Sequence, residues 1–132
     1  MRIGSYSRAD YESLFQEGIP SDSAVICFYD INKGSMDLPL HIDSYQVAMD
    51  GLAFDDADVL AHFVFYAKAA GLNIICVCED GMTTSAGCMA AIIQFFCGDG
   101  IDVFVNDCYF PDKQIYHVVF NALIKESLER EE

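Results

Sequence analysis

Continuous runs of apolar residues are the strongest strand signals in this sequence. The segments 23–29 and 72–78 are rich in β-branched and aromatic residues and have no alternating polar face. Such runs are typical of strands that are buried on both faces of a parallel sheet. Two weaker strands are expected, a short edge strand at 1–6 and a weakly alternating one at 45–49. Turn-forming residues indicate a loop at 31–44.

Helical periodicity and capping residues predict helices between these strands. Ser7, followed three residues later by the carboxylate of Asp10, opens the first helix, and Gly18 ends it. Further helices are expected at 57–70, 85–96 and 101–107, and from Pro111 or Asp112 to about 130. Strands that alternate with helices predict one α/β domain over residues 1–132, with a largely parallel central sheet flanked by helices. Ligands bind such folds at the carboxyl ends of the strands.

The composition agrees with a packed domain and limits its partners. Of 132 residues, 53% are hydrophobic and 21% are charged, which excludes an intrinsically disordered chain. The 21 acidic residues outnumber the 7 lysines and arginines, and the formal net charge is -14. A surface this acidic repels phosphate backbones and anionic lipid headgroups. We therefore expect neither a nucleic acid nor a membrane partner, whereas a basic protein partner is compatible with the charge.

Neither a membrane span nor a secretory signal is apparent. The longest charge-free run, 83–98, contains Thr, Ser, Gly and Gln, and it is shorter than the roughly 20 apolar residues that a span needs. The chain does not open with a basic segment followed by an apolar stretch. We therefore expect a cytoplasmic protein with reduced cysteines.

The six cysteines lie mostly within apolar runs, where free cysteine packs as a small hydrophobic residue. No C-x-x-C pair is present, so the sequence does not predict a structural zinc site. Cys76 and Cys78 point to the same face of one predicted strand, and packing explains this pair better than a metal does. No metal or other cofactor is expected. His62 lies on an otherwise apolar helix and is expected to be a partly buried core residue.

The junction between the second strong strand and the following helix carries the candidate chemistry. Cys78 ends the strand, Gly81 follows after three residues, and Ser85 starts the helix. The N–H groups of such a tight loop converge at a helix N-terminus, where the helix dipole favours an anion. The same field favours a nucleophilic thiolate at Cys78. Helix capping alone would explain Thr83, Thr84 or Ser85 singly, but not the spacing from cysteine to serine.

This junction resembles the signature loop of the cysteine-dependent tyrosine and dual-specificity phosphatases, in which His-Cys precedes five residues, an arginine, and a serine or threonine. Cys78 falls on the nucleophile, Gly81 on the loop glycine, and Ser85 on the hydroxyl that assists departure of the thiolate. The Ala-rich helix after the loop and the Tyr-x-Pro-(x)4-Tyr pattern at 109–116 are similar to small bacterial members. The resemblance implies a tyrosine-phosphatase-like fold with Cys78 as the catalytic nucleophile.

The resemblance also implies a phosphate-binding loop and a general acid. The loop residues expected around the ligand are Glu79, Asp80, Gly81, Met82, Thr83 and Thr84. Their ligand would be a phosphate-like anion or a phosphoprotein, weakly bound. Asp55 and Asp56 are the candidates for the acid that protonates the leaving oxygen. Aspartate is also a favoured N-cap, and capping of the following helix is the simpler explanation for these two residues.

Two departures from the family pattern change the expected activity. Thr84 stands at the arginine position, and Val77 stands at the histidine position before the nucleophile. An arginine grips two phosphoryl oxygens at once, and in other phosphoryl-transfer enzymes such arginines contribute about 10³–10⁵ in rate. Lys33 or Lys113 could approach from a neighbouring loop to replace it. Asp80, in contrast, would repel a phosphate dianion.

Three functions stay open on this basis. The favoured one is a phosphatase-like protein that is impaired or inactive because Thr84 replaces the signature-loop arginine. The second retains slow or atypical Cys78-dependent chemistry, as a phosphatase or thiol hydrolase. In the third, an acidic protein-interaction module binds a basic partner through its charge.

Overall fold

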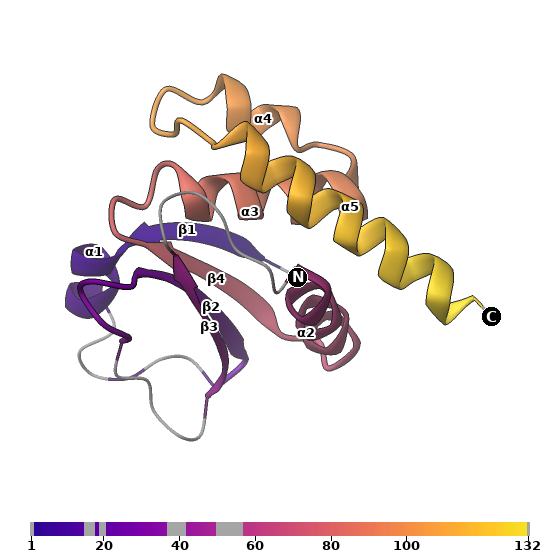
Figure 1. The fold of residues 1–132 in the computed structure, drawn as a ribbon, viewed down its shortest axis with the longest axis horizontal. Helices are drawn as coiled ribbons and strands as arrows, with labels where there is room; N and C mark the ends of the chain where they lie inside the picture. Colours follow the sequence, from indigo (N-terminus) through magenta and orange to yellow (C-terminus); the bar gives the residue numbers. More distant parts are fainter. Residues whose placement is uncertain (1, 15–17, 19–20, 37–41, 50–56, 132) are drawn as a thin grey trace.

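The strands and helices predicted from the sequence are present in the computed structural model, which describes residues 2–14, 18, 21–36, 42–49 and 57–131. Along these ranges the elements are β1 (Ile3–Ser7), α1 (Arg8–Leu14), β2 (Ser23–Asp30), β3 (Asp43–Met49), α2 (Ala57–Ala69), β4 (Asn73–Cys78), α3 (Thr84–Cys97), α4 (Ile101–Val105) and α5 (Lys113–Arg130) (Figure 1). The predicted alternation of strands and helices is therefore confirmed.

The strands form one parallel sheet in the order β1-β4-β2-β3. The two continuous apolar runs became the central strands β4 and β2, which pair Cys76 with Ile26. A central strand covered on both faces must be apolar throughout, which explains why these runs do not alternate. The weaker strand β1 lies at one edge, as predicted, and β3 lies at the other. Because all the pairings are parallel, the carboxyl ends of the strands meet at one edge of the sheet.

Side chains alternate between two hydrophobic layers on opposite faces of the sheet. Ile74, Cys76 and Cys78 of β4 belong to the larger cluster, which also contains residues of α2, α3 and α5. Ile75 and Val77 point to the other face and join a smaller cluster with α1. Figure 1 shows α3, α4 and α5 together on one side of the sheet. The predicted fold class, a parallel sheet flanked by helices, is confirmed.

Several helix ends follow the capping signals in the sequence. The Oγ of Ser7 accepts a hydrogen bond from the N–H of Asp10 at 3.0 Å, which gives α1 its N-cap. The carboxylate of Asp112 accepts one from the N–H of Ile115 at 2.9 Å and caps α5. Gly98 ends α3 with a φ of 81°, a left-handed conformation that glycine adopts without steric cost.

His62 is not the partly buried core residue that the sequence predicted. Its side chain is 70% exposed, and its Nδ1 lies 3.1 Å from the carboxylate of Glu126 on α5. The prediction was wrong because α2 buries only one stripe, which includes Leu60, Ala61 and Val64, and His62 lies beside that stripe.

The cysteines behave as the packing residues that the sequence indicated. All six are free thiols, and four of them are buried. Burial raises the pKa of Cys27 to about 12. A hydrogen bond with Cys76, followed by burial, raises the pKa of Cys88 well above its usual range. Thiols with such raised pKa values stay protonated and unreactive at neutral pH.

Two negative findings hold for the described part of the chain. None of its helices is long and apolar enough to cross a membrane. Its His, Cys, Asp and Glu side chains do not gather in any group of three or more that could hold a metal ion.

Candidate functional site

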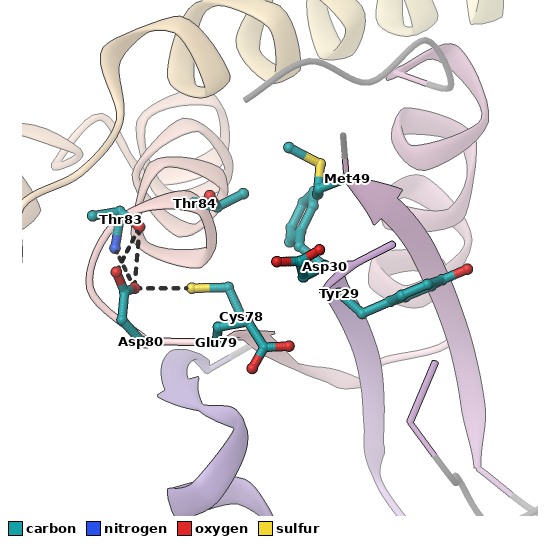
Figure 2. A pocket seen from close by; sticks show the side chains of 9 residues that line it. Tyr29, Asp30, Met49, Cys78, Glu79, Asp80, Thr83 and Thr84 are labelled. Atoms are coloured by element: carbon teal, nitrogen blue, oxygen red, sulfur yellow. Dashed lines mark hydrogen bonds between the residues drawn. The ribbon is translucent and has the colours of Figure 1, made fainter. Parts of the chain in front are cut away.

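The candidate site is the loop between β4 and α3. The strand ends at Cys78 and the helix begins at Thr84, so residues 79–83 connect them. Because β4 lies between β1 and β2, this loop lies in the middle of the carboxyl edge of the sheet, where ligands bind in open α/β folds. Figure 2 shows the Cys78 sulfur pointing toward Asp80 at the start of the loop.

Cys78 is buried, and its sulfur has three polar neighbours. The N–H of Gly81 donates to the sulfur over 3.2 Å, and the Oγ of Ser85 lies 3.1 Å away. The thiol itself donates to Oδ1 of Asp80 over 3.3 Å. The loop therefore holds the sulfur in place, and one of its neighbours is a carboxylate of that same loop.

The edge strand β1 contributes a residue that sequence reasoning missed. Ser5 is buried, and its hydroxyl donates to the carbonyl oxygen of Gly81 over 2.8 Å. The Oγ atoms of Ser5 and Ser85 lie 2.6 Å apart. Since the single proton of Ser5 goes to the Gly81 carbonyl, Ser85 is the donor between the two serines. Ser85 thus contacts both β1 and the Cys78 sulfur, which is a different role from helix capping.

Gly81 is required by its conformation and by its surroundings. Its φ of +70° lies in the left-handed region, which L side chains rarely adopt. A Cβ at this position would also overlap the backbone of Tyr6 and Ser7, where β1 runs into α1. The glycine that marks the loop in the sequence is therefore fixed by the close approach of β1.

The carboxylate of Asp80 accepts hydrogen bonds from the loop that follows it. Oδ1 accepts from the N–H of Met82 at 2.8 Å and from the N–H of Thr83 at 3.1 Å. The Thr83 hydroxyl lies 3.1 Å from Oδ1 and 3.0 Å from Oδ2 (Figure 2). Partial burial by itself would raise the pKa of Asp80, but hydrogen bonds from Met82, Cys78 and Thr83 outweigh it and lower the pKa. Asp80 is therefore ionised at neutral pH.

The first turn of α3 does not use a threonine cap. Thr83 is the N-cap residue, but its side chain makes no capping hydrogen bond, because its hydroxyl is bonded to Asp80. Thr84 is buried at the start of the helix.

Glu79 attracts the cations that lie near the loop. Arg8 approaches it with Nη1 3.3 Å from Oε1, and Lys33 with Nζ 3.9 Å from Oε2. Lys33 is thus paired with a carboxylate, while Lys113, the first residue of α5, does not line the pocket over the loop.

A pocket of about 180 Å³ lies over the loop, at the ends of β2, β3 and β4. The described residues that line it are Phe28, Tyr29, Asp30, Met49, Cys78, Glu79, Asp80, Thr83 and Thr84 (Figure 2). Three of these side chains are carboxylic acids and none is basic. The pocket therefore has negative charge where a phosphate site needs positive charge.

Two expected residues cannot be assigned a place, and the pocket residues from β2 and β3, including the carboxylate of Asp30, were not expected. Asp55 and Asp56 lie outside the described residues, so their role stays a prediction. Asp30 could have been predicted from the sequence. It directly follows an apolar run, and neighbouring parallel strands end at the same edge of the sheet, so its carboxylate is expected near the end of β4. Ser5 could not have been, since its contacts depend on β1 lying beside β4.

No protein-family model and no curated protein matches this sequence. Solved structures match over nearly the whole chain. The human tyrosine phosphatase-like serine/threonine/tyrosine-interacting protein is similar with a TM-score of 0.62 and 14% identity, over 98% of this chain and 99% of that chain. Human DUSP28 has a TM-score of 0.63 and 13% identity, over 98% and 95%. Tk-PTP in its active form has a TM-score of 0.63 and 11% identity, over 95% and 92%. The fold that the signature-loop resemblance implied is confirmed, and this chain has a protein tyrosine/dual-specificity phosphatase-like fold.

Proposed function

We propose that this chain is a phosphatase-fold protein that has lost efficient hydrolysis of phosphate monoesters and acts as a binding or regulatory module. The observation that carries the proposal is the charge of the loop. Thr84 stands where the resemblance requires an arginine, and the Asp80 carboxylate accepts the hydrogen bonds of two loop amides. Phosphoryl transfer needs positive charge where negative charge develops, and the described residues that line the pocket supply none.

The surroundings of Cys78 do not favour a bound phosphoryl group. The Cys78 sulfur lies 3.3 Å from Oδ1 of Asp80, and this ionised carboxylate would repel a phosphate dianion beside the sulfur. The Thr84 hydroxyl is at best one neutral donor, whereas a guanidinium would hold two phosphoryl oxygens. In other phosphoryl-transfer enzymes, an arginine that stabilises the transition state contributes about 10³–10⁵ in rate.

Hydrolysis of para-nitrophenyl phosphate between about pH 5 and pH 8 tests this proposal, with Cys78→Ser as the matched control. We expect the two proteins to be indistinguishable. Cys78-dependent turnover near 1 s⁻¹, which is about the low end of ordinary enzymes, would overturn the proposal. Turnover that is a thousandfold slower but still lost in Cys78→Ser would favour the slow, atypical Cys78 chemistry instead.

One observation favours a positively charged segment of another protein as the binding partner. Asp30, Glu79 and Asp80 line the pocket. Beside it, Met82 and Phe110 are 39% and 66% exposed, and the Phe110 N–H donates to the Met82 carbonyl over 2.9 Å. A segment with a Lys or Arg next to an apolar side chain matches this surface in charge and polarity. A similar solved structure is itself named a phosphatase-like interacting protein.

Fluorescence anisotropy with labelled peptides tests this second proposal. A Lys-containing peptide with an apolar neighbour is compared with its Glu-containing counterpart and with a phosphotyrosine peptide. We expect only the Lys peptide to bind, with an affinity that falls as salt is raised. Asp30→Asn should weaken this binding, whereas Glu129→Gln, an equal charge change near the far end of α5, should not. Equal binding of the basic and acidic peptides would contradict the proposal.

A further inference from the structure

We propose that Asp80 is a specificity-determining residue whose carboxylate occupies the oxyanion position of the loop and excludes phosphate, independently of the missing arginine. This inference rests on the proposed function, because it concerns the same loop, and it adds a second cause for the loss of phosphate binding. The carboxylate is an anion of the protein itself, and it binds the loop amides that an external anion would otherwise bind.

The position of one oxygen atom carries this inference. Oδ1 of Asp80 accepts from the amides of Met82 and Thr83 at 2.8 Å and 3.1 Å, and it lies 3.3 Å from the sulfur of Cys78. Two backbone donors at a helix start and a thiol beside them are the groups that would surround a phosphoryl oxygen. The oxygen found there belongs to a side chain of the loop.

Asp80 competes strongly with any external anion because it belongs to the same loop as the amides that it binds. Asp80 precedes Met82 by two residues and Thr83 by three, so its carboxylate is always close to their N–H groups. Even a flexible short tether gives an effective concentration in the mM range, so inorganic phosphate must exceed that range to displace it. The displaced carboxylate would remain close by and repel the phosphate.

The same geometry predicts what an arginine at position 84 would do alone. Thr84 and Asp80 both line the pocket, so a guanidinium on residue 84 would have an ionised carboxylate within reach. The two side chains would pair with each other. Restoring the arginine therefore does not by itself restore a phosphate site.

Phosphate titrations of four proteins test the inference. The wild type, Thr84→Arg, Asp80→Ala and the double variant are titrated with inorganic phosphate, and the ¹⁵N–¹H NMR shifts of the loop amides are followed. We expect the double variant to bind phosphate at least about tenfold more tightly than Thr84→Arg, the effect of about one charged hydrogen bond. Asp80→Ala alone should gain less, because it supplies no positive charge.

A charge-matched variant separates this role from general electrostatics. Thr84→Arg combined with Glu129→Ala has the same net charge as the double variant, and Glu129 is an exposed residue near the C-terminal end of α5. We expect it to bind phosphate no better than Thr84→Arg alone. A gain equal to that of the double variant would overturn the inference.

Two further results would also overturn it. One is phosphate affinity in Thr84→Arg equal to that in the double variant, and the other is no phosphate binding by the double variant. If Asp80 has only a structural role, removing it lowers the Tm of the double variant but leaves its phosphate affinity equal to that of Thr84→Arg. If Asp80→Ala does not fold, Asp80→Asn replaces it in the double variant. The Asn oxygen is a neutral acceptor that competes less well than a carboxylate for the two amides, so phosphate affinity should still exceed that of Thr84→Arg alone.

The failures of the two proposals are distinguishable. Cys78-dependent hydrolysis by the wild type would overturn the proposed function. The phosphate affinities of the Asp80 variants decide the role of Asp80, whether or not the wild type is active.

Discussion

A loop N–H binds one acceptor well at a time, so the Asp80 carboxylate and an external oxyanion compete for the amides of Met82 and Thr83. At the scale of the residue, our two proposals therefore concern two side chains. Thr84 does not carry the positive charge of an arginine, and the Asp80 carboxylate accepts the hydrogen bonds of these two amides. The fold can keep its shape while the loop changes the charge that it accepts, because backbone geometry and side-chain charge are set by different residues.

Replacing Asp80 with Asn should reduce stability in a pH-dependent way. Partial burial raises the pKa of Asp80, but its hydrogen bonds outweigh burial, and the net pKa in the folded protein is below the ordinary value. The ionised form therefore stabilises the native state. This contribution is complete above the ordinary pKa of about 3.9 and disappears as the pH falls through the lower folded value.

Urea denaturation of the wild type and Asp80→Asn measures this effect. At pH 7 we expect the variant to lose about 1 kcal/mol of unfolding free energy, because the carboxylate accepts several loop hydrogen bonds but is exposed to solvent. The difference should shrink below about pH 4. A difference that stays constant with pH would show that charge is not the cause.

At the scale of elements, the loop depends on how closely β1 approaches it. Ser5 of β1 binds the Gly81 carbonyl and contacts Ser85 at the start of α3. The backbone of Tyr6 and Ser7, at the end of β1, lies where a Cβ on Gly81 would be. The edge strand thus positions the loop although it forms no part of the pocket lining. Its pairing with β4, from Ile3 with Ile74 to Ser7 with Cys78, brings these groups together.

Gly81→Ala should be much more destabilising than the same change at another left-handed glycine. Both Gly81 and Gly71 have positive φ, but a Cβ on Gly71 meets nothing within 4 Å. Gly71→Ala is expected to cost about 1–2 kcal/mol for the conformation alone. Gly81→Ala adds a backbone overlap and should cost about 2–4 kcal/mol. Equal midpoints for the two variants in urea would contradict the close approach of β1.

At the scale of the whole molecule, acidic charge is combined with a phosphatase-like architecture. The chain has 21 acidic and 7 basic residues, and each ion pair of the described residues has at least one side chain that is about a third or more exposed. Solvent-exposed pairs contribute little to stability, so we expect repulsion among the excess carboxylates to outweigh the ion pairs in the folded state.

The thermal stability should accordingly rise with salt. Between about 10 mM and 150 mM NaCl the Debye length falls from about 30 Å to about 8 Å, which screens repulsion among the carboxylates. We expect the Tm measured by circular dichroism to increase by several degrees at pH 7, since about 1 kcal/mol shifts Tm by 4–8 °C in domains of up to 100 residues and by less in larger ones. Near pH 4 the increase should be smaller because many carboxylates are protonated. A Tm that falls with salt at pH 7 would mean that favourable ion pairs dominate.

Much of the fold followed from local patterns. The apolar runs that became β2 and β4 predicted the central strands, because burial on both faces leaves no polar position. Ser7 and Asp112 predicted helix starts through contacts within a few residues. His62 was misassigned, because helical periodicity alone does not say where the edge of a buried face lies.

The sequence by itself determined that Cys78 ends a buried strand and that a tight turn at Gly81 leads from it into a helix, since these features rest on periodicity, apolar content and short-range steric limits. Only the tertiary structure decided the partners of that loop. Ser5 reaches Ser85 across 80 positions, and Asp30 shares the pocket with Asp80, because the strand order places β1 and β2 on either side of β4. Even the nearby partners of Asp80, the N–H groups of Met82 and Thr83, were not predictable from the sequence. Several donors lie close to this carboxylate along the chain, and the folded backbone determines which of them point toward it.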